Sequence, residues 1–293
     1  MPTGSEHWRS LEVYMKHVCA ITGTSGYVGS RISEALFSDF TIVPLGRRVK
    51  SGGIRWQLGG GSVQDELCKR AVTVLIHAAW DFSHRGARDN WQANVEGSKM
   101  LIDDALSAGV RQIVFISSIS SFPSSRSQYG MAKYAVEQLV TKANGTVIRS
   151  GLVWGENAGG VFGSLEERAS KGGIMPMIGN GGYLQYLVHE DDLVETVRRA
   201  AHGEFHNRVL TVAHPGAWPL RSLILQMAHD SGKEVSFIHV PWYVVYMCLR
   251  AAEALGLKLD FRSDSVMSLV YQDRTPNLSR ALQLRAFRSE TPI

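Results

Sequence analysis

Three polar side chains in the middle of the chain, Ser118, Tyr129 and Lys133, are of the types that move protons to and from an oxygen atom. Tyr129 and Lys133 have the i,i+4 spacing that puts two side chains on one face of a helix. A free tyrosine, with a pKa of about 10, is a poor base at neutral pH, and a nearby ammonium group favours the phenolate. We therefore expect Lys133 to lower the pKa of Tyr129, so that the pair exchanges a proton with a substrate hydroxyl while hydride moves at the carbon.

A glycine-rich segment near the start of the chain predicts where the hydride carrier binds. An apolar run from Val18 to Ile21 leads into Gly23, Gly26 and Gly29, and apolar residues then recur at helical spacing. Glycines allow a tight turn and a close approach of the backbone to a pyrophosphate, which the N-terminus of the following helix attracts. The segment therefore predicts a dinucleotide site, with contacts from Gly23, Ser25, Gly26, Tyr27, Val28 and Gly29.

The end of the second predicted strand bears on the choice of dinucleotide. Residues Thr41 to Leu45 are followed by Gly46, Arg47 and Arg48. In this kind of site an acidic residue holds the ribose 2′-hydroxyl of NAD, whereas an arginine accommodates the 2′-phosphate of NADP. The acidic residue is absent and two arginines stand in its place. The sequence thus favours NADP over NAD, the alternative being that both arginines are solvated loop charges.

Apolar segments alternate with helical segments along the first half of the chain, which is typical of an α/β fold with a doubly wound parallel sheet of the Rossmann type. Strands are expected at residues 18–21, 41–45, 54–58, 72–76 and 113–118, and helices at 91–108 and 129–142. Ligands bind such sheets beyond the carboxyl ends of the strands. The small residues Ala78 and Ala79 would let a cofactor lie across one such end, and we expect His77 to pack or flank the cofactor there.

These segments together resemble a known family. The motifs Thr22–Gly29, His77–Ala79, Asn94–Gly97, Ser117–Ser118 and Tyr129-x-x-x-Lys133 are similar to those of the extended short-chain dehydrogenases/reductases. More narrowly, they resemble the NAD-dependent epimerase/dehydratase family. The resemblance covers roughly residues 16–257, and later segments extend it at residues 148–155, 188–193, 208–213 and 233–241.

The resemblance implies a role for each residue of the catalytic set. It implies that Tyr129 is the general acid/base, that Lys133 holds the nicotinamide ribose and that Ser118 hydrogen-bonds the reacting oxygen. Asn94 would support a local water or backbone link. The implied contacts to the cofactor also include Ala78, Ala79, Asn94, Ser117 and Lys133. The resemblance further implies a homodimer formed through the helices expected at residues 91–108 and 129–142.

The sequence defines the substrate less sharply. Many nucleotide-sugar enzymes of this family grip the diphosphate with an arginine where this chain has Gln185, and an amide cannot replace the paired, charged contacts of a guanidinium. We expect hydride transfer at a sugar carbon, by 4-keto reduction or epimerisation, with a nucleotide-activated sugar as the first candidate. The alternatives are a carbonyl reductase acting on a non-sugar ketone and a non-catalytic dinucleotide sensor, which would not need the complete catalytic set.

Three parts are expected along the chain. Residues 1–14 are predicted to be a disordered extension, since Met15 directly precedes the first strand. Residues 15–155 are predicted to form the NAD(P)-binding Rossmann core. Residues 156–293 are predicted to bind mainly the substrate, with late strands and helices returning to the core.

The composition argues against several other classes of function. A net charge of +4 over 293 residues, with no long basic run, does not favour nucleic acid as a partner. Three scattered cysteines without metal-ligand spacing predict a reduced, cytoplasmic protein with no metal site. The apolar run from Val240 to Leu249 is too short to span a bilayer. Its stripe of Trp242, Tyr243, Tyr246 and Met247 recurs at helical spacing and is expected to pack in the core, the alternative being a helix on a membrane surface.

Overall fold

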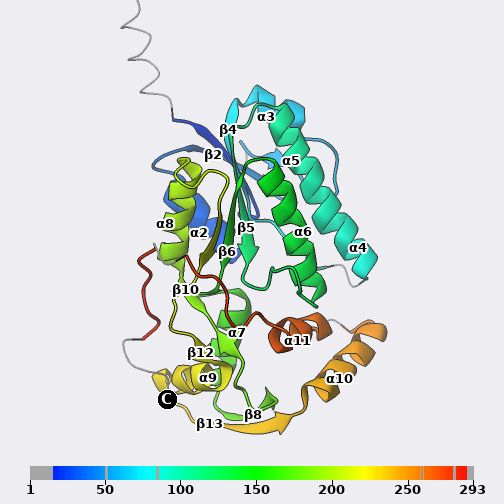
Figure 1. The fold of residues 1–293 in the computed structure, drawn as a ribbon, viewed down its shortest axis with the longest axis vertical. Coiled ribbons are helices and arrows are strands. Elements are labelled where there is room, and N and C mark those ends of the chain that lie inside the picture. The colour runs from blue at the N-terminus through cyan, green and yellow to red at the C-terminus, as the bar shows by residue number, and fades with distance from the viewer. Residues whose placement is uncertain are drawn as a thin grey trace, which may run out of the picture.

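The computed structural model describes residues 16–49, 52–83, 86–257, 259, 261–279 and 282–288. The extension predicted at residues 1–14 lies outside these described residues. A central sheet covered by helices forms the upper part of the molecule in Figure 1, and a smaller group of helices and short strands lies below it.

Seven strands form the central sheet, and every pair of neighbours in it is parallel. In spatial order they are β11 (Val209–Val212), β6 (Thr146–Ser150), β5 (Gln112–Ser118), β4 (Val72–His77), β1 (Val18–Thr22), β2 (Thr41–Gly46) and β3 (Ile54–Arg55). The chain reverses its direction of winding between β1 and β4, which is where open sheets of this kind bind ligands. The prediction of a doubly wound parallel sheet is confirmed.

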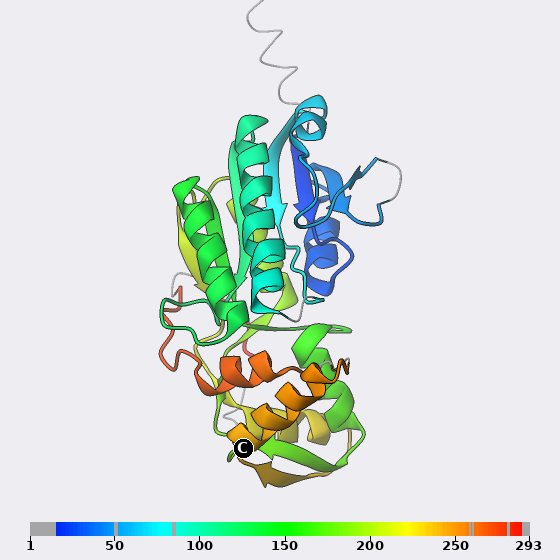
Figure 2. The ribbon, with the colours of Figure 1, turned by 90° about the vertical axis from the view of Figure 1, so that its right-hand side faces the viewer.

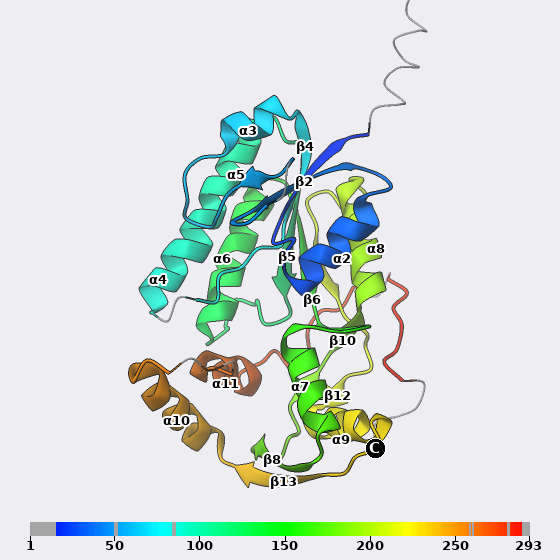
Figure 3. The ribbon, with the colours of Figure 1, turned by 180° about the vertical axis from the view of Figure 1, so that it is seen from behind.

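Helices cover both faces of this sheet (Figures 1 and 3). Two of them, α2 (Tyr27–Leu36) and α8 (Glu190–Ala201), pack against each other on one face. The opposite face carries α3 (Gln64–Lys69), α5 (Gly97–Ser107) and α6 (Gln128–Lys142). Each face has its own buried apolar core, which the strands share through their alternating side chains. The strand ends that bear the candidate residues are therefore held rigidly.

The helix expected at residues 91–108 is divided into three pieces. The α-helix α4 (Ala87–Trp91) passes into a π-helical turn, η1 (Gln92–Glu96), before α5 begins at Gly97. A side chain at Gly97 would meet the backbone nitrogen of Gly59 at 2.5 Å, so the helix packs directly against the loop that follows β3. Single π-helical turns are frequent at functional sites, and this one contains the candidate residue Asn94.

Among the described residues, the lower part consists of three two-stranded pairings and four helices. Figure 2 shows them below the central sheet. The strand pairs are β7 (Leu152–Trp154) with β10 (Leu187–His189), β8 (Gly173–Ile178) with β13 (Val235–Val240), and β9 (Leu184–Gln185) with β12 (Trp218–Pro219). The helices are α7 (Gly160–Ser170), α9 (Leu220–Asp230), α10 (Trp242–Ala254) and α11 (Ser263–Val270). The chain enters this part after β6, returns to the sheet with α8 and β11, and then leaves it again.

Helix α10 corrects one expectation. Its aromatic residues were expected to pack in the core, but the helix has no fully buried residue, and Tyr243 and Met247 are 57% and 65% exposed. Helical spacing predicted the helix correctly, whereas burial depends on whether another element covers it. None of the helices in the described ranges is both long and apolar enough to cross a membrane.

Candidate functional site

The glycine-rich turn between β1 and α2 is built for a close backbone approach. Gly23 has φ +76°, a left-handed conformation that favours glycine, and a side chain there would lie 2.8 Å from the backbone nitrogen of Ala79. A side chain at Gly29 would lie 2.1 Å from the carbonyl oxygen of Gly23. Helix α2 starts after Gly26 without a side-chain cap. The turn therefore presents an uncapped helix N-terminus, which suits the pyrophosphate of a dinucleotide.

A chain of buried hydrogen bonds fixes the neighbouring strand end. The hydroxyl of Thr22 accepts from the backbone nitrogens of Ala78 and Ala79 at 3.1 and 3.0 Å. Thr22 must then donate its own proton to Nδ1 of His77, 2.8 Å away, whose Nε2 lies 2.8 Å from the hydroxyl of Ser98. Burial lowers the pKa of His77 to about 3. His77 is thus a neutral, packed histidine, as expected.

Asn94 continues this network toward the loop after β4. The hydroxyl of Ser98 donates to the carbonyl oxygen of Asn94, and the Asn94 side chain both accepts from and donates to the backbone of Asp81, at 2.8 and 2.9 Å. Asn94 is fully buried. It therefore acts on the loop through backbone hydrogen bonds, and that loop lines the cavity described next.

A cavity of about 1510 Å³ runs from the glycine turn into the lower part of the molecule. It brings together most of the predicted site residues, namely Gly23, Ser25, Gly26, Tyr27, Val28, Gly29, Arg47, Arg48, Ala78, Ala79, Ser118 and Tyr129. The remaining predicted residues, Asn94, Ser117 and Lys133, lie behind its described lining. The sheet thus gathers side chains that are more than 100 residues apart in sequence at one edge, as parallel strands do.

Tyr129 lines this cavity from the first turn of α6. Its ring packs edge-on against Trp80, with centroids 5.7 Å apart, and stacks on Phe82 at 5.8 Å. Burial raises the pKa of Tyr129 to about 12, partly offset by a hydrogen bond with Ser118 at the end of β5. The expectation that Lys133 lowers this pKa is wrong for this structure. Tyr129 is here a neutral phenol, which can donate a proton.

Lys133 is buried one helical turn further along α6, with its Nζ 5.9 Å from the centroid of the Tyr129 ring. Its Nζ donates to the carbonyl oxygen of Ile116 at 2.7 Å and lies 4.1 Å from the centroid of Trp80. Burial lowers the pKa of Lys133 to about 7, while the nearby carboxylate of Glu137 acts in the opposite direction. The lysine is therefore held on the tyrosine's face of the helix, as the spacing predicts, but its ammonium group is bound to the end of β5.

Three side-chain oxygen atoms accept from the first three backbone N–H groups of α6 and so fix Tyr129. The carboxylate of Asp264, in α11, accepts from the nitrogens of Gln128 and Tyr129 at 2.6 and 3.0 Å. The hydroxyl of Ser127 accepts from Gly130 at 3.0 Å, and the Ser127 carbonyl accepts from the next residue. The first three N–H groups of the helix, which have no partner within it, are thus bound by side chains, and the fourth forms the first hydrogen bond of the helix itself. Asp264 thus links the C-terminal part of the chain to the candidate acid.

Ser117 faces away from the cavity, because successive residues of a strand point to opposite sides. Its hydroxyl donates to Glu137 of α6 at 2.5 Å, and the same carboxylate forms a paired contact with Arg149 of β6. Glu137 is fully buried. The cluster joins α6 to two neighbouring strands, so Ser117 holds the helix that carries Tyr129.

The two arginines after β2 are placed at the opposite end of the cavity. Both Arg47 and Arg48 line it next to Leu45 and Gly46, and both are exposed. Within the described part of the chain neither guanidinium forms a hydrogen bond or an ion pair. Two cations at the edge of the sheet are therefore available to a ligand.

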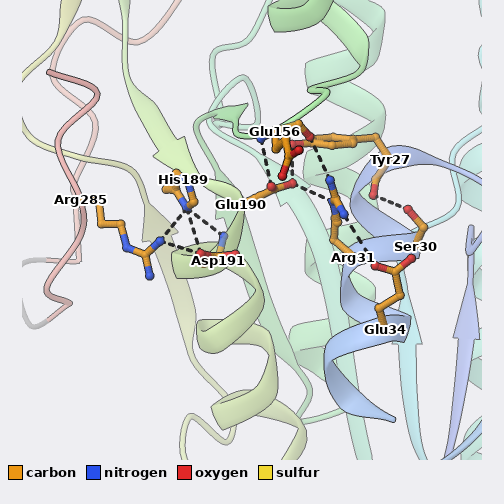
Figure 4. A network of polar contacts seen from close by, with 9 residues as sticks. All are labelled: Tyr27, Ser30, Arg31, Glu34, Glu156, His189, Glu190, Asp191 and Arg285. Carbon is orange, nitrogen blue, oxygen red and sulfur yellow. Dashed lines mark hydrogen bonds and ion pairs between the residues drawn. The ribbon is translucent and has the colours of Figure 1, made fainter.

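Tyr27, the residue after Gly26, anchors the glycine motif to the lower part of the molecule (Figure 4). Its hydroxyl donates to Glu190 at 2.6 Å, and Arg31 donates to the same oxygen at 2.8 Å. The other oxygen of Glu190 accepts from the backbone nitrogen of Glu156 at 3.1 Å. Glu190 therefore ties α2 to the start of α8, and Tyr27 borders the cavity with its hydroxyl already bound.

The C-terminal segment reaches the same end of α8. Arg285 donates to Asp191 at 2.6 Å and lies 3.2 Å from Nδ1 of His189 (Figure 4). The backbone nitrogen of Arg285 also donates to Asp192 at 2.6 Å. Residues near the end of the described chain thus help to hold the junction between the sheet and the lower part.

Several cavity residues were missed by sequence reasoning. They include Trp56, Gln57, Trp80, Phe82, Asp264 and Gln272. Trp80 directly follows Ala78 and Ala79 at the end of β4. Because these two residues were predicted to contact the cofactor, the sequence could also have indicated Trp80. Its Nε1 is buried and has no hydrogen-bond partner within the described residues. The residues after position 260 carried no comparable signal, since only the tertiary fold brings α11 to the site.

Comparison with known proteins identifies the family of this chain. Two features together are typical of a short-chain dehydrogenase/reductase. One is a glycine-rich turn at the switch point of a doubly wound sheet, and the other is a serine at the end of a later strand with a tyrosine and a lysine on the helix that follows. The profile of the NAD-dependent epimerase/dehydratase family matches residues 19–213, and the chain belongs to this family. The prediction of an oxidoreductase or epimerase of this type is confirmed at the level of the family.

Individual relatives are more distant. The chain is 24% identical over 260 residues to N-acetyl-alpha-D-glucosaminyl-diphospho-ditrans,octacis-undecaprenol 4-epimerase of Escherichia coli O157:H7, covering 76% of this chain and 75% of that protein. It is 25% identical over 187 residues to ceramide reductase of Caulobacter vibrioides, covering 60% and 58%. The solved structure of UDP-glucose 4-epimerase from Thermotoga maritima with UDP-glucose has a TM-score of 0.63 at 19% identity, covering 86% and 96% of the two chains. This last likeness shows the fold.

Proposed function

We propose that this protein is an NADP(H)-dependent oxidoreductase or epimerase that transfers hydride at an oxygen-bearing carbon, with a sugar carbon as the first candidate. The observation that carries the proposal is that one cavity contains the glycine cradle, Ser118 and Tyr129 together. Membership of the epimerase/dehydratase family and the two 4-epimerases among the similar proteins support the sugar carbon.

Each end of the cavity has its own part in this proposal. Gly23, Gly26 and Gly29 would hold the pyrophosphate. Lys133, whose Nζ is bound to the Ile116 carbonyl behind the described cavity lining, would turn to the nicotinamide ribose when the dinucleotide binds. The bound dinucleotide supplies or accepts the hydride. Because burial raises the pKa of Tyr129 to about 12, this residue holds a proton that it can give to a carbonyl oxygen. Ser118 would hydrogen-bond that oxygen, so the carbonyl becomes a secondary alcohol once the carbon has gained the hydride.

The preference for NADP rests on Arg47 and Arg48. Both guanidinium groups border the cavity beyond the carboxyl end of β2, and within the described residues neither is neutralised by a carboxylate. A 2′-phosphate at this edge would gain charge-assisted hydrogen bonds that a 2′-hydroxyl cannot match.

A reductase acting on a non-sugar ketone is the second candidate, and the observation that favours it concerns Gln185. This residue lines the cavity, and its Nε2 donates to the carbonyl oxygen of Leu184 at 3.1 Å. The position expected to grip a diphosphate therefore offers a neutral amide that is already engaged.

A tyrosine pair on α6 tests the proposed chemistry. Tyr129→Phe should leave cofactor affinity unchanged and lower turnover by about 10²–10⁴-fold, the contribution typical of a positioned acid/base. Tyr134→Phe is the matched control, because Tyr134 lies on the same helix but outside the described cavity lining. Turnover would be followed as NADPH oxidation with a UDP-4-keto sugar and with a long-chain 2-alkanone. Equal turnover in the two variants would remove Tyr129 from the mechanism.

We also infer a cytoplasmic homodimer that pairs α5 and α6. Met100 and Leu106 on α5 and Met131 on α6 are 45%, 46% and 44% exposed, which supports an apolar contact between two copies of this helical face. Light scattering of the purified protein should give twice the mass of one chain, and Met131→Lys should shift it toward the monomer. A wild-type monomer at micromolar concentration would contradict this arrangement.

A further inference from the structure

We infer that the substrate carries a long hydrocarbon chain beyond its reacting carbon, in place of a nucleoside diphosphate. The inference rests on the proposed hydride transfer and names the class of substrate that the same cavity takes. Its basis is the chemistry of the cavity wall on the side of Tyr129 that faces away from the glycine turn.

This half of the cavity is lined mainly by aliphatic and thioether side chains. They come from separate elements of the lower part, α7, β8, α9, α10 and α11, and are Leu165, Met175, Met177, Ile224, Val245 and Leu269. Met175 and Met177 are almost fully buried and adapt to irregular apolar shapes. Such a surface binds hydrocarbon by removing it from water and gives a diphosphate few partners.

The charged side chains that line the substrate half of the cavity do not favour a diphosphate. Among the described lining residues, the cations Arg47 and Arg48 belong to the cofactor end, and the substrate half has a single cation, Arg262. Arg262 donates to the carbonyl oxygen of Phe82 at 3.2 Å. Two carboxylates, Asp264 and Asp273, line the same half. A doubly charged diphosphate would therefore meet more negative than positive charge there.

Helix α10 presents one valine to the cavity and the neighbouring valine to the outside. Val245 lines the cavity, whereas Val244 is 39% exposed and lies outside the described cavity lining. The two positions therefore separate a change in the cavity wall from a change on the surface of the same helix.

Two adjacent valines supply the matched variants for a test. Nile red, a neutral apolar dye, would be bound to the protein in the presence of NADP⁺ and displaced by 2-hexanone, 2-octanone, 2-decanone and 2-dodecanone. Each added methylene should tighten binding by about fourfold where it is buried. Val245→Lys should weaken 2-dodecanone binding by about tenfold or more, since it puts a charge into the apolar wall. Val244→Lys should leave that affinity unchanged, and neither variant should alter NADPH affinity.

The outcomes separate this inference from the proposed function. Affinity that rises with chain length and falls only in Val245→Lys supports the hydrocarbon subsite. Tight binding of UDP-glucose to the NADP⁺ complex, with no dependence on ketone chain length, would overturn the inference and leave the hydride-transfer function standing. Failure of the wild-type protein to bind NADPH or NADH would remove the proposed function itself.

Discussion

The contact between Asp264 and helix α6 makes a prediction about a residue far from the catalytic set in sequence. Asp264 accepts from the nitrogens of Gln128 and Tyr129 and is half-buried against the cavity. In Asp264→Ala the first two N–H groups of α6 lose their acceptor. The helix should fray at its first turn, which is the turn that carries Tyr129.

The size of the effect follows from the two hydrogen bonds. Loss of a helix N-cap destabilises a protein by about 0.5–2 kcal/mol, and a hydrogen bond to a charged group contributes about 1.5–3 kcal/mol. Part of this is regained because burial raises the pKa of Asp264, which means that the folded state disfavours its charge. We expect a net loss of about 2 kcal/mol in the free energy of unfolding, measured by urea denaturation.

Activity should respond together with stability. In Asp264→Ala, kcat should fall while the Kd for NADPH stays unchanged, since the glycine turn is untouched. Asp264→Asn, which keeps one carbonyl acceptor, should lie between alanine and wild type in both measurements. Asp273→Ala is a suitable control, because Asp273 lines the same cavity but accepts only from the Thr275 backbone among the contacts described. Asp264→Ala with wild-type stability and wild-type kcat would refute this reasoning.

Two further substitutions test the cradle and the buried lysine. Gly29→Ala puts a methyl group 2.1 Å from the carbonyl oxygen of Gly23, so α2 must shift, and NADPH affinity measured by cofactor fluorescence should fall by about tenfold or more. Gly61→Ala, with open space around it, should bind NADPH normally, and equal affinities in the two variants would contradict the cradle. Because burial lowers the pKa of Lys133 from 10.5 to about 7, the charged amine disfavours the fold below pH 7, and this penalty fades as the pH rises toward 10.5. The free energy of unfolding of Lys133→Met should therefore be higher than that of the wild type, and the difference should be largest at about pH 6 and smallest at about pH 10. A difference that stays constant with pH would show that the lysine is not desolvated.

The parts of the site that depend on neighbouring residues could be predicted from the sequence. The turn at Gly23 and Gly29 follows from local backbone requirements, and the i,i+4 spacing alone puts Tyr129 and Lys133 on one face of α6. The alternation of apolar strands and helices was enough to predict the parallel sheet. The polar ends of two strands could then be assigned to one edge of that sheet.

Other features depend on contacts between distant segments and carry no local signal. The ammonium group of Lys133 binds the Ile116 carbonyl at 2.7 Å, a geometry that spacing cannot give, so its expected effect on the tyrosine was wrong. The π-helical turn ends where Gly97 packs closely against Gly59, a contact between two separate segments of the chain. Asp264 reaches Tyr129 across 135 residues. On α10, Trp242 packs against Tyr271 while Tyr243 is 57% exposed, so the burial of each aromatic residue depends on which neighbours the fold supplies.

Binding of the two nicotinamide cofactors tests the central claim most directly. The purified protein, first checked for retained cofactor, would be titrated with NADPH and with NADH while cofactor fluorescence is followed. A double variant, Arg47→Ser with Arg48→Ser, would be compared with Arg55→Ser, which removes an exposed arginine of β3 outside the described cavity lining. The account predicts that the wild type and Arg55→Ser prefer NADPH and that the double variant loses this preference with its NADH affinity intact. Tightly retained NAD, or an NADPH preference that survives in the double variant, would contradict it.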